Sequence, residues 1–216
     1  MADAHADHEH DDTAMPTADE AWERLLAGNE RFRAGRARAA PTREELGRLS
    51  DGQQPFATIL GCSDSRVPPE WVFDAAPGEL FVIRVAGNVF SAEVAGSLQY
   101  AGAHLRTPLF VVLGHEGCGA VAAALKTRDA GARHLSRIQV LVDSILPALG
   151  DVPADVSDSE LLPRAVESNV RWTMNQILST PEGKARVAEG KLKLVGAVYE
   201  LTTGGVRIVT PAESLI

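Results

Sequence analysis

The most informative part of this 216-residue sequence is residues 56–66, FATILGCSDSR. It begins with a short apolar run and ends in a polar turn that carries Cys62, one of the two cysteines of the chain. An uninterrupted apolar run of this length is typical of a strand that is covered on both faces in a parallel sheet. We therefore predict a buried strand over residues 56–61, with Cys62 just beyond its carboxyl end.

A second stretch, LFVVLGHEGC at residues 109–118, repeats this pattern and holds the other cysteine, Cys118. Further strands are predicted at residues 80–85 and 192–198, and a short edge strand at 206–209. Helical patterns lie before and between the strands, at residues 17–32, 42–49, 92–105, 118–127, 135–149 and 161–178. The predicted fold is α/β, a mostly parallel central sheet of four strands with an antiparallel edge strand and helices on both faces.

The two cysteine motifs together supply ligands for one zinc ion. Because the carboxyl ends of parallel strands meet at one edge of a sheet, Cys62, His115 and Cys118 can approach one another there. Two thiolates and one imidazole are typical of catalytic zinc with an open fourth position, which Asp64 could fill conditionally. The alternative is that both cysteines are buried core thiols. It is less favoured, because each cysteine stands at a strand end beside further metal-binding residue types.

At these motifs the chain resembles the beta-class carbonic anhydrases. The resemblance rests on residues 61–68, GCSDSRVP, and residues 114–120, GHEGCGA, and it extends through residues 84–88 and 97–101 to 195–209. It implies reversible hydration of carbon dioxide to bicarbonate and a proton by a zinc-bound hydroxide, with one Zn²⁺ per chain. It also implies a homodimer or a tetramer of dimers with the pocket at the interface.

The resemblance assigns a role to eight side chains: zinc ligation by Cys62, His115 and Cys118, catalysis by Asp64 and Arg66, and substrate binding by Gln53, Phe81 and Tyr100. The pairing of Asp64 with Arg66 also has an independent physical reason. An arginine that forms a bidentate pair with Asp64 would hold this carboxylate off the metal and leave room for water. The alternative interpretation is a structural ion pair at a turn. Since two thiolates formally cancel the charge of zinc, we expect activity to rise on the alkaline side.

Composition and length limit the class of protein further. The sequence is long enough for one substantial core, and we predict a single zinc-binding α/β domain over residues 16–216, with N-terminal helices that dock on a neighbouring subunit. Residues 1–15 are acidic and rich in histidine, which predicts a disordered tail. The net charge of −8 argues against nucleic acid and anionic membranes as partners. Free thiols as ligands favour the reducing cytoplasm.

Two other functions are compatible with the same residues. A metal-activated water could hydrolyse carbonyl sulfide or carbon disulfide, because selection among these gases depends on the pocket and its entrance. The chain could also be a non-catalytic module that zinc stabilises. A closed structural site has no need of an arginine that restrains Asp64, so the module is the less favoured of the two.

Overall fold

The computed structural model describes residues 15–153 and 156–209 of the chain. In these residues, five strands form one sheet in the order β2-β1-β3-β4-β5. The strands are β1 (Ala57–Gly61), β2 (Leu80–Arg84), β3 (Leu109–His115), β4 (Lys193–Tyr199) and β5 (Val206–Ile208). The first four are parallel, and β5 runs antiparallel to β4 at one edge, which confirms the predicted sheet. The tail predicted over residues 1–15 lies outside the described residues except for Met15.

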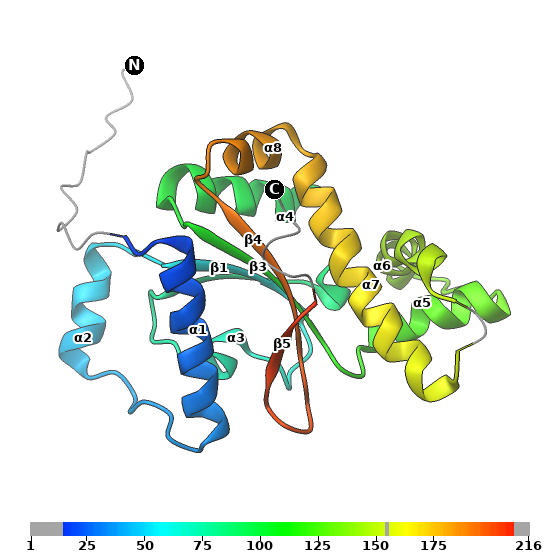
Figure 1. The fold of residues 1–216 in the computed structure, drawn as a ribbon, viewed down its shortest axis with the longest axis horizontal. Helices are drawn as coiled ribbons and strands as arrows, with labels where there is room; N and C mark the ends of the chain where they lie inside the picture. Colours follow the sequence, from blue (N-terminus) through cyan, green and yellow to red (C-terminus); the bar gives the residue numbers. More distant parts are fainter. Residues whose placement is uncertain (1–14, 154–155, 210–216) are drawn as a thin grey trace.

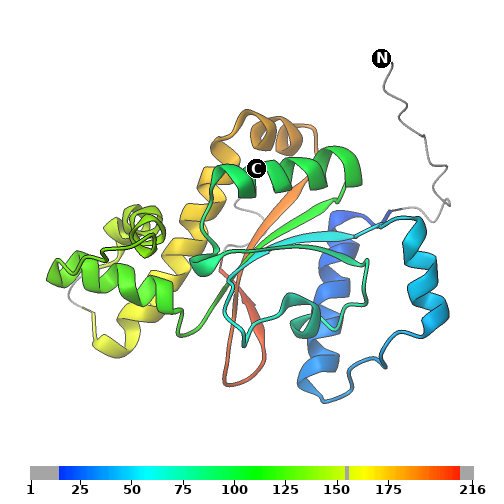
Figure 2. The same cartoon turned by 180° about the vertical axis from the view of Figure 1, so that it is seen from behind.

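Helices flank the sheet on both sides (Figure 1, Figure 2). They are α1 (Ala18–Arg33), α2 (Arg43–Arg48), α3 (Pro69–Val72), α4 (Ala92–Tyr100), α5 (Gly119–Ala130), α6 (Ile138–Ile145), α7 (Asp158–Ser179) and α8 (Pro181–Ala188). Both views place α1 and α2 on one side of the sheet and α4 to α8 on the other. Among the described helices, none is long and apolar enough to cross a membrane.

The sheet separates two apolar cores, because successive residues of a strand point to opposite faces. In β3, Val111 belongs to the core that α1 and α3 cover, and its neighbour Val112 belongs to the core that α4, α5 and α7 cover. The same division applies to Ile59 and Leu60 in β1. Every residue of β1 and of β3 is buried, as expected for central strands of a parallel sheet. These two neighbouring strands therefore form a rigid base for the segments that follow them.

Helix α1 begins at a capping box, in which the Thr17 hydroxyl accepts from the Glu20 N–H and the Glu20 carboxylate accepts from the Thr17 N–H. The helix buries Ala21, Trp22 and Leu25 in the core of its own chain. Helix α2 has the same kind of capping box but no buried residue. The docking of these helices on a neighbouring subunit stays a prediction, although within one chain α1 is already packed.

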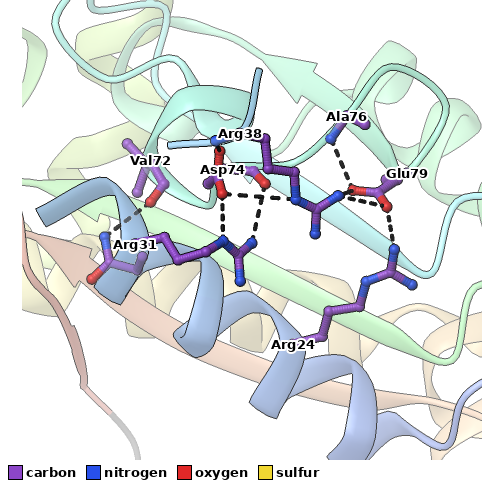
Figure 3. Close-up of polar contacts among 8 residues, drawn as sticks. Arg24, Arg31, Arg38, Val72, Asp74, Ala76 and Glu79 are labelled. Carbon is purple, nitrogen blue, oxygen red and sulfur yellow. Dashed lines mark hydrogen bonds and ion pairs between the residues drawn. The ribbon is translucent and has the colours of Figure 1, made fainter. Parts of the chain in front are cut away.

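A cluster of ion pairs fastens α1 and the segment after it to the loop that precedes β2 (Figure 3). Arg31 Nε lies 2.5 Å from Asp74 Oδ2, and the Arg38 N–H donates to Asp74 Oδ1 at 2.8 Å. Glu79 accepts from the guanidinium groups of Arg24 and Arg38. Burial opposes ionisation of Asp74, but the Arg38 N–H and the Arg31 guanidinium outweigh burial and hold the pKa of Asp74 below its ordinary value. This loop leads directly into β2.

Some helices differ from the predicted ones where the sequence signal is short or interrupted. The helix predicted over residues 135–149 is α6 followed by a 3-10 segment (Leu146–Asp151), because Pro147 lacks the N–H that a continuing helix needs. The helix predicted over residues 92–105 ends in a π turn (Ala101–Leu105). Helices α3 and α8 were not predicted; α3 has only four residues, too few to show a period.

Candidate metal centre

The two cysteine motifs meet at one edge of the sheet because β1 and β3 are adjacent and parallel. Gly61 at the end of β1 is in register with Leu113 of β3. Cys62 follows β1 directly, His115 is the last residue of β3, and Cys118 is the N-cap of α5. Their Sγ, imidazole nitrogen and Sγ atoms all lie within 4.8 Å of one another, and the three side chains are buried. The structure thus brings the three predicted zinc ligands to one point.

His115 has its imidazole fixed in an orientation that suits metal binding. Its Nδ1 lies 2.9 Å from the backbone oxygen of Glu116, a geometry in which Nδ1–H donates to this carbonyl. The ring is fully buried, and Nε2 has no hydrogen-bond partner among the described residues. A buried nitrogen without a partner costs free energy unless another group uses it. With the proton on Nδ1, the lone pair of Nε2 is available to a cation, as in other histidine metal sites.

The two thiols stabilise one thiolate between them. A hydrogen bond from Cys118 is the main reason that the pKa of Cys62 falls to about 4, and His115 and the Gly87 N–H contribute to the same effect. The same contact, together with burial, raises the pKa of Cys118. Burial alone would lower the pKa of His115, but the proximity of the Cys62 sulfur and its negative charge raise it. A buried cluster that concentrates negative charge on sulfur is a favourable site for a divalent cation.

Asp64 and Arg66 form the predicted bidentate pair. Arg66 Nε and Nη2 donate to Asp64 Oδ1 and Oδ2 at 2.9 and 2.7 Å, and the Arg66 backbone N–H also donates to Oδ1 at 3.0 Å. These bonds hold the pKa of Asp64 well below its ordinary value, so the carboxylate is ionised at neutral pH. Asp64 Oδ2 lies 3.9 Å from His115 Nε2, which places this charge beside the three-donor cluster.

Residues outside the two motifs hold the turn after β1 in place. Arg84, at the end of β2, donates from Nε to the Cys62 carbonyl at 2.9 Å and from Nη2 to the Asp64 carbonyl at 2.6 Å. The Gly87 N–H donates to Cys62 Sγ at 3.3 Å. Sequence reasoning did not assign this contact to Gly87, because a backbone N–H leaves no trace in residue type. The only available signal was the run RVAGN at residues 84–88.

Glu116 lies between His115 and Cys118 in the sequence, but its carboxylate binds a backbone N–H and is not one of the donor groups. Glu116 Oε2 accepts from the Leu201 N–H at 3.0 Å, in the turn between β4 and β5. The Glu116 N–H in turn donates to the carbonyl of Tyr199 at the end of β4. The carboxylate therefore fastens the β3–α5 turn to the neighbouring strand.

The three residues predicted to bind substrate are not part of the cluster of donor atoms. The rings of Phe81 and Tyr100 lie together, with centroids 6.0 Å apart, and the Tyr100 side chain is 48% exposed. Gln53 is exposed on the connection between the 3-10 turn Leu49–Asp51 and β1. On β2, Phe81 lies three residues before Arg84, which is about 10 Å along the strand from the edge that carries Cys62. A role at a substrate pocket stays a prediction for these three residues.

Comparison with known proteins gives a consistent result. A family model described as carbonic anhydrase matches residues 57–206. Carbonic anhydrase 2 of Mycobacterium tuberculosis is 39% identical over 187 residues, which cover 85% of this chain and 89% of that protein. A carbonic anhydrase of Mycolicibacterium smegmatis is 35% identical over 192 residues, which cover 87% of this chain and 91% of that protein.

Solved structures share the fold over most of the chain. A beta-carbonic anhydrase of Sordaria macrospora, described as tetrameric, superposes with a TM-score of 0.71 at 24% identity, covering 89% of this chain and 93% of that chain. The beta-carbonic anhydrase of Coccomyxa, solved with acetazolamide, superposes with a TM-score of 0.68 at 26% identity, covering 88% and 82% of the two chains.

Proposed function

This chain belongs to the beta-class carbonic anhydrases, and we propose that it interconverts carbon dioxide and bicarbonate with one zinc ion held by Cys62, His115 and Cys118. The observation that carries the proposal is the buried cluster at the ends of β1 and β3, which contains two sulfurs and one imidazole nitrogen that has no hydrogen-bond partner within residues 15–153 and 156–209. The charged pair of Asp64 and Arg66 beside it supplies groups for chemistry that a purely structural site would not need.

The donor set fits zinc by type and by arrangement. Thiolate sulfur and neutral imidazole are ligands that zinc prefers, and three donor atoms within 4.8 Å of one another can contact one ion. The Nδ1–H bond of His115 to a backbone carbonyl is the kind of outer contact that orients a metal-binding histidine. Bound there, zinc would supply a Lewis acid that makes water reactive toward carbon dioxide.

We propose that Asp64 orients the reacting water. Its ionised carboxylate can accept a hydrogen bond and so fix the direction from which the water oxygen approaches carbon dioxide. Arg66 keeps Asp64 ionised and engages both carboxylate oxygens, which holds the group at the side of the metal position. If the pair with Arg66 were broken, Asp64 would be free to act as the fourth ligand and to exclude water.

We further propose that Gln53, Phe81 and Tyr100 bind substrate at a pocket shared by two copies of the chain. Within one chain, Phe81 and Tyr100 lie together but Phe81 is set back along β2 from the three donors. Tyr100 is half exposed, so a second copy could bury it. The tetrameric state described for the relative from Sordaria macrospora supports a homodimer or a tetramer of dimers. Two free buried cysteines support a reducing, cytoplasmic location.

The decisive experiment is a stopped-flow assay of carbon dioxide hydration on the purified protein, with zinc content measured on the same samples. The parent protein should contain about one zinc per chain and be active. His115→Asn should lose zinc and activity together, because only two sulfurs would remain. The matched control is His134→Asn, which removes an imidazole on the connection between α5 and α6 and should change neither quantity.

Retained activity in a zinc-free parent sample would contradict the proposal. The same assay run with carbonyl sulfide and carbon disulfide distinguishes a carbonic anhydrase from the hydrolase alternative. A carbonic anhydrase should turn over carbon dioxide fastest. A parent protein that binds zinc and turns over none of the three gases would support the non-catalytic module instead.

A further inference from the structure

The Cys62 sulfur accepts a hydrogen bond from a backbone N–H that lies outside both cysteine motifs. The bond is donated by the Gly87 N–H to Cys62 Sγ at 3.3 Å. Gly87 lies in a 3-10 turn (Ala86–Asn88) that follows β2. Hydrogen bonds to a metal-binding thiolate disperse its charge and fix its position, and outer contacts of this kind tune how firmly a metal is held.

The turn has no room for a side chain at Gly87. Gly87 has φ +72°, a left-handed conformation that glycine adopts without strain. A Cβ atom at this position would lie 2.7 Å from Ile145 Cδ1 and 3.1 Å from Ala120 Cβ. Because the turn is this short and this confined, the direction of the Gly87 N–H depends on how the turn itself is held.

Two buried polar side chains of α7 hold the turn through its carbonyls. Asn169 Nδ2 donates to the Gly87 carbonyl at 2.8 Å, and Thr173 Oγ1 donates to the Asn88 carbonyl at 3.1 Å. The two residues are four positions apart, so they lie on one face of the helix. That face is otherwise apolar and packs in the core beside β3 and β4 through Val166, Val170 and Met174.

Both side chains are polar groups in an otherwise apolar core. Asn169 is 1% exposed and Thr173 is fully buried. Asn169 Oδ1 has no hydrogen-bond partner among the described residues, and such a buried oxygen is destabilising. Each side chain nevertheless gives a donor to a buried carbonyl of the turn. The two polar side chains on this apolar face are therefore matched to the backbone of the 86–88 turn.

We propose that Asn169 and Thr173 are positioning residues of the metal centre, which hold the 86–88 turn so that the Gly87 N–H stays bonded to the Cys62 sulfur. The inference rests on the proposed function, since it takes Cys62 as a zinc ligand. Loss of either side chain frees a carbonyl of the turn, weakens the N–H···S bond and loosens the sulfur. The metal then leaves more readily, and the electronic environment of the remaining metal–sulfur contact changes.

The test measures zinc release and the sulfur environment separately from activity. Zinc transfer to an excess of chelator should be about 10-fold to 100-fold faster in Asn169→Ala and in Thr173→Val. In the cobalt-substituted forms of both variants, the sulfur-to-metal charge-transfer band should shift relative to that of the parent protein. Thr173→Ser retains the hydroxyl and should restore the parent rate and the parent band.

The matched control is Ser168→Ala on the same helix. Ser168 Oγ donates to the carbonyl of Ala148 at 2.6 Å, a bond of the same type that does not touch the turn. This variant should release zinc at the parent rate. If it releases zinc as fast as Asn169→Ala does, the effect comes from general weakening of α7 and the positioning role is wrong.

The outcomes also separate this inference from the function on which it rests. If the parent protein binds no zinc, the proposed function fails and the inference fails with it. If the parent binds zinc and folded Asn169→Ala and Thr173→Val match its release rate and its cobalt band, only the inference is overturned. Should Asn169→Ala fail to fold, the comparison of Thr173→Val with Thr173→Ser decides the question by itself.

Discussion

Asp64 is the residue whose charge the site controls most tightly, since Arg66 donates to both of its oxygens and from its backbone to one of them. The neighbouring His115 is controlled in a different way: one bond from Nδ1 to a carbonyl fixes the ring, and Nε2 has no hydrogen-bond partner in the part of the chain that the structure describes. In both residues, hydrogen bonds fix the protonation and the orientation of the side chain. This is the usual means by which a protein prepares a reactive site before substrate arrives.

The role of Asp64 can be tested by a nearly isosteric change. Asp64→Asn keeps the size of the side chain but removes the charge and one acceptor oxygen, so we expect carbon dioxide hydration to fall by about 10²–10⁴-fold. Zinc content should stay at the parent value, because the three proposed ligands are unchanged. Asp129→Asn is the control: Asp129 is paired with Arg128 on α5, outside the site. Full activity of Asp64→Asn would show that the carboxylate is only a structural partner of Arg66.

The sequence alone was sufficient to predict that Cys62, His115 and Cys118 approach one another, but not everything that orients them. Cysteine, histidine and aspartate at two strand ends are rare enough to be informative. The Gly87 N–H carries no such signal, because every residue except proline has one. Asn169 and Thr173 look in sequence like ordinary polar positions of an amphipathic helix, and only the packing of α7 shows that they point inward.

At the scale of elements, the long apolar runs of β1 and β3 were predicted because a strand buried on both faces has no polar positions. Helices α3 and α8 were missed for two different reasons. α3 makes a single turn, so it has no period to detect. α8 begins directly after α7, at an N-cap Thr180 followed by Pro181, and this boundary signal was not used.

The packing of α1 on its own chain makes a direct prediction about stability. Leu25 is fully buried between α1 and the sheet, so Leu25→Ala should lower the free energy of unfolding by about 2–5 kcal/mol. Leu46→Ala on α2 is the control, since Leu46 is 47% exposed and the change should cost no more than about 0.5 kcal/mol. Denaturant unfolding of the three proteins measures both values. A cost for Leu25→Ala as small as that for Leu46→Ala would mean that α1 does not pack on its own chain in solution.

The ion-pair cluster of Figure 3 predicts how stability depends on pH. The folded pKa of Asp74 lies below its ordinary value, so the folded state binds the proton of Asp74 less readily than the unfolded chain does. The stabilisation is therefore present above the unfolded value of about 4 and is lost as the pH falls through the folded pKa. Asp74→Asn should lower the free energy of unfolding by about 1–3 kcal/mol at pH 7.

Measurement of unfolding from pH 7 down to pH 3 checks the sign. The difference between the parent and Asp74→Asn should shrink as the solution becomes acidic, because the parent then loses the same charge. Asp129→Asn provides the comparison for an exposed ion pair and should change the curve little. A difference for Asp74→Asn that stays constant over this range would mean that the Arg31 and Arg38 contacts do not depend on its charge.

At the scale of the whole molecule, the architecture places both proposed ligand motifs at the carboxyl ends of β1 and β3, two neighbouring interior strands of the sheet. The residues predicted to bind substrate lie elsewhere: Phe81 on the edge strand β2, and Tyr100 at the end of α4. Large apolar side chains are exposed on the same chain, including Trp71 at 70% and Tyr100 at 48%. Exposed aromatic groups of this size are typical of surfaces that bind another protein.

We therefore expect sedimentation to give a mass of at least two chains of 23.0 kDa. The sharper test of a shared pocket uses two inactive variants. Tyr100→Ala chains keep the zinc ligands, and Cys118→Ser chains keep Tyr100. If Tyr100 acts on the metal of a second copy, mixed twofold dimers contain one complete site, and an equal mixture after subunit exchange should recover roughly a quarter of parent activity. If Tyr100 acts within its own chain, no mixture can regain activity, because neither chain holds both parts.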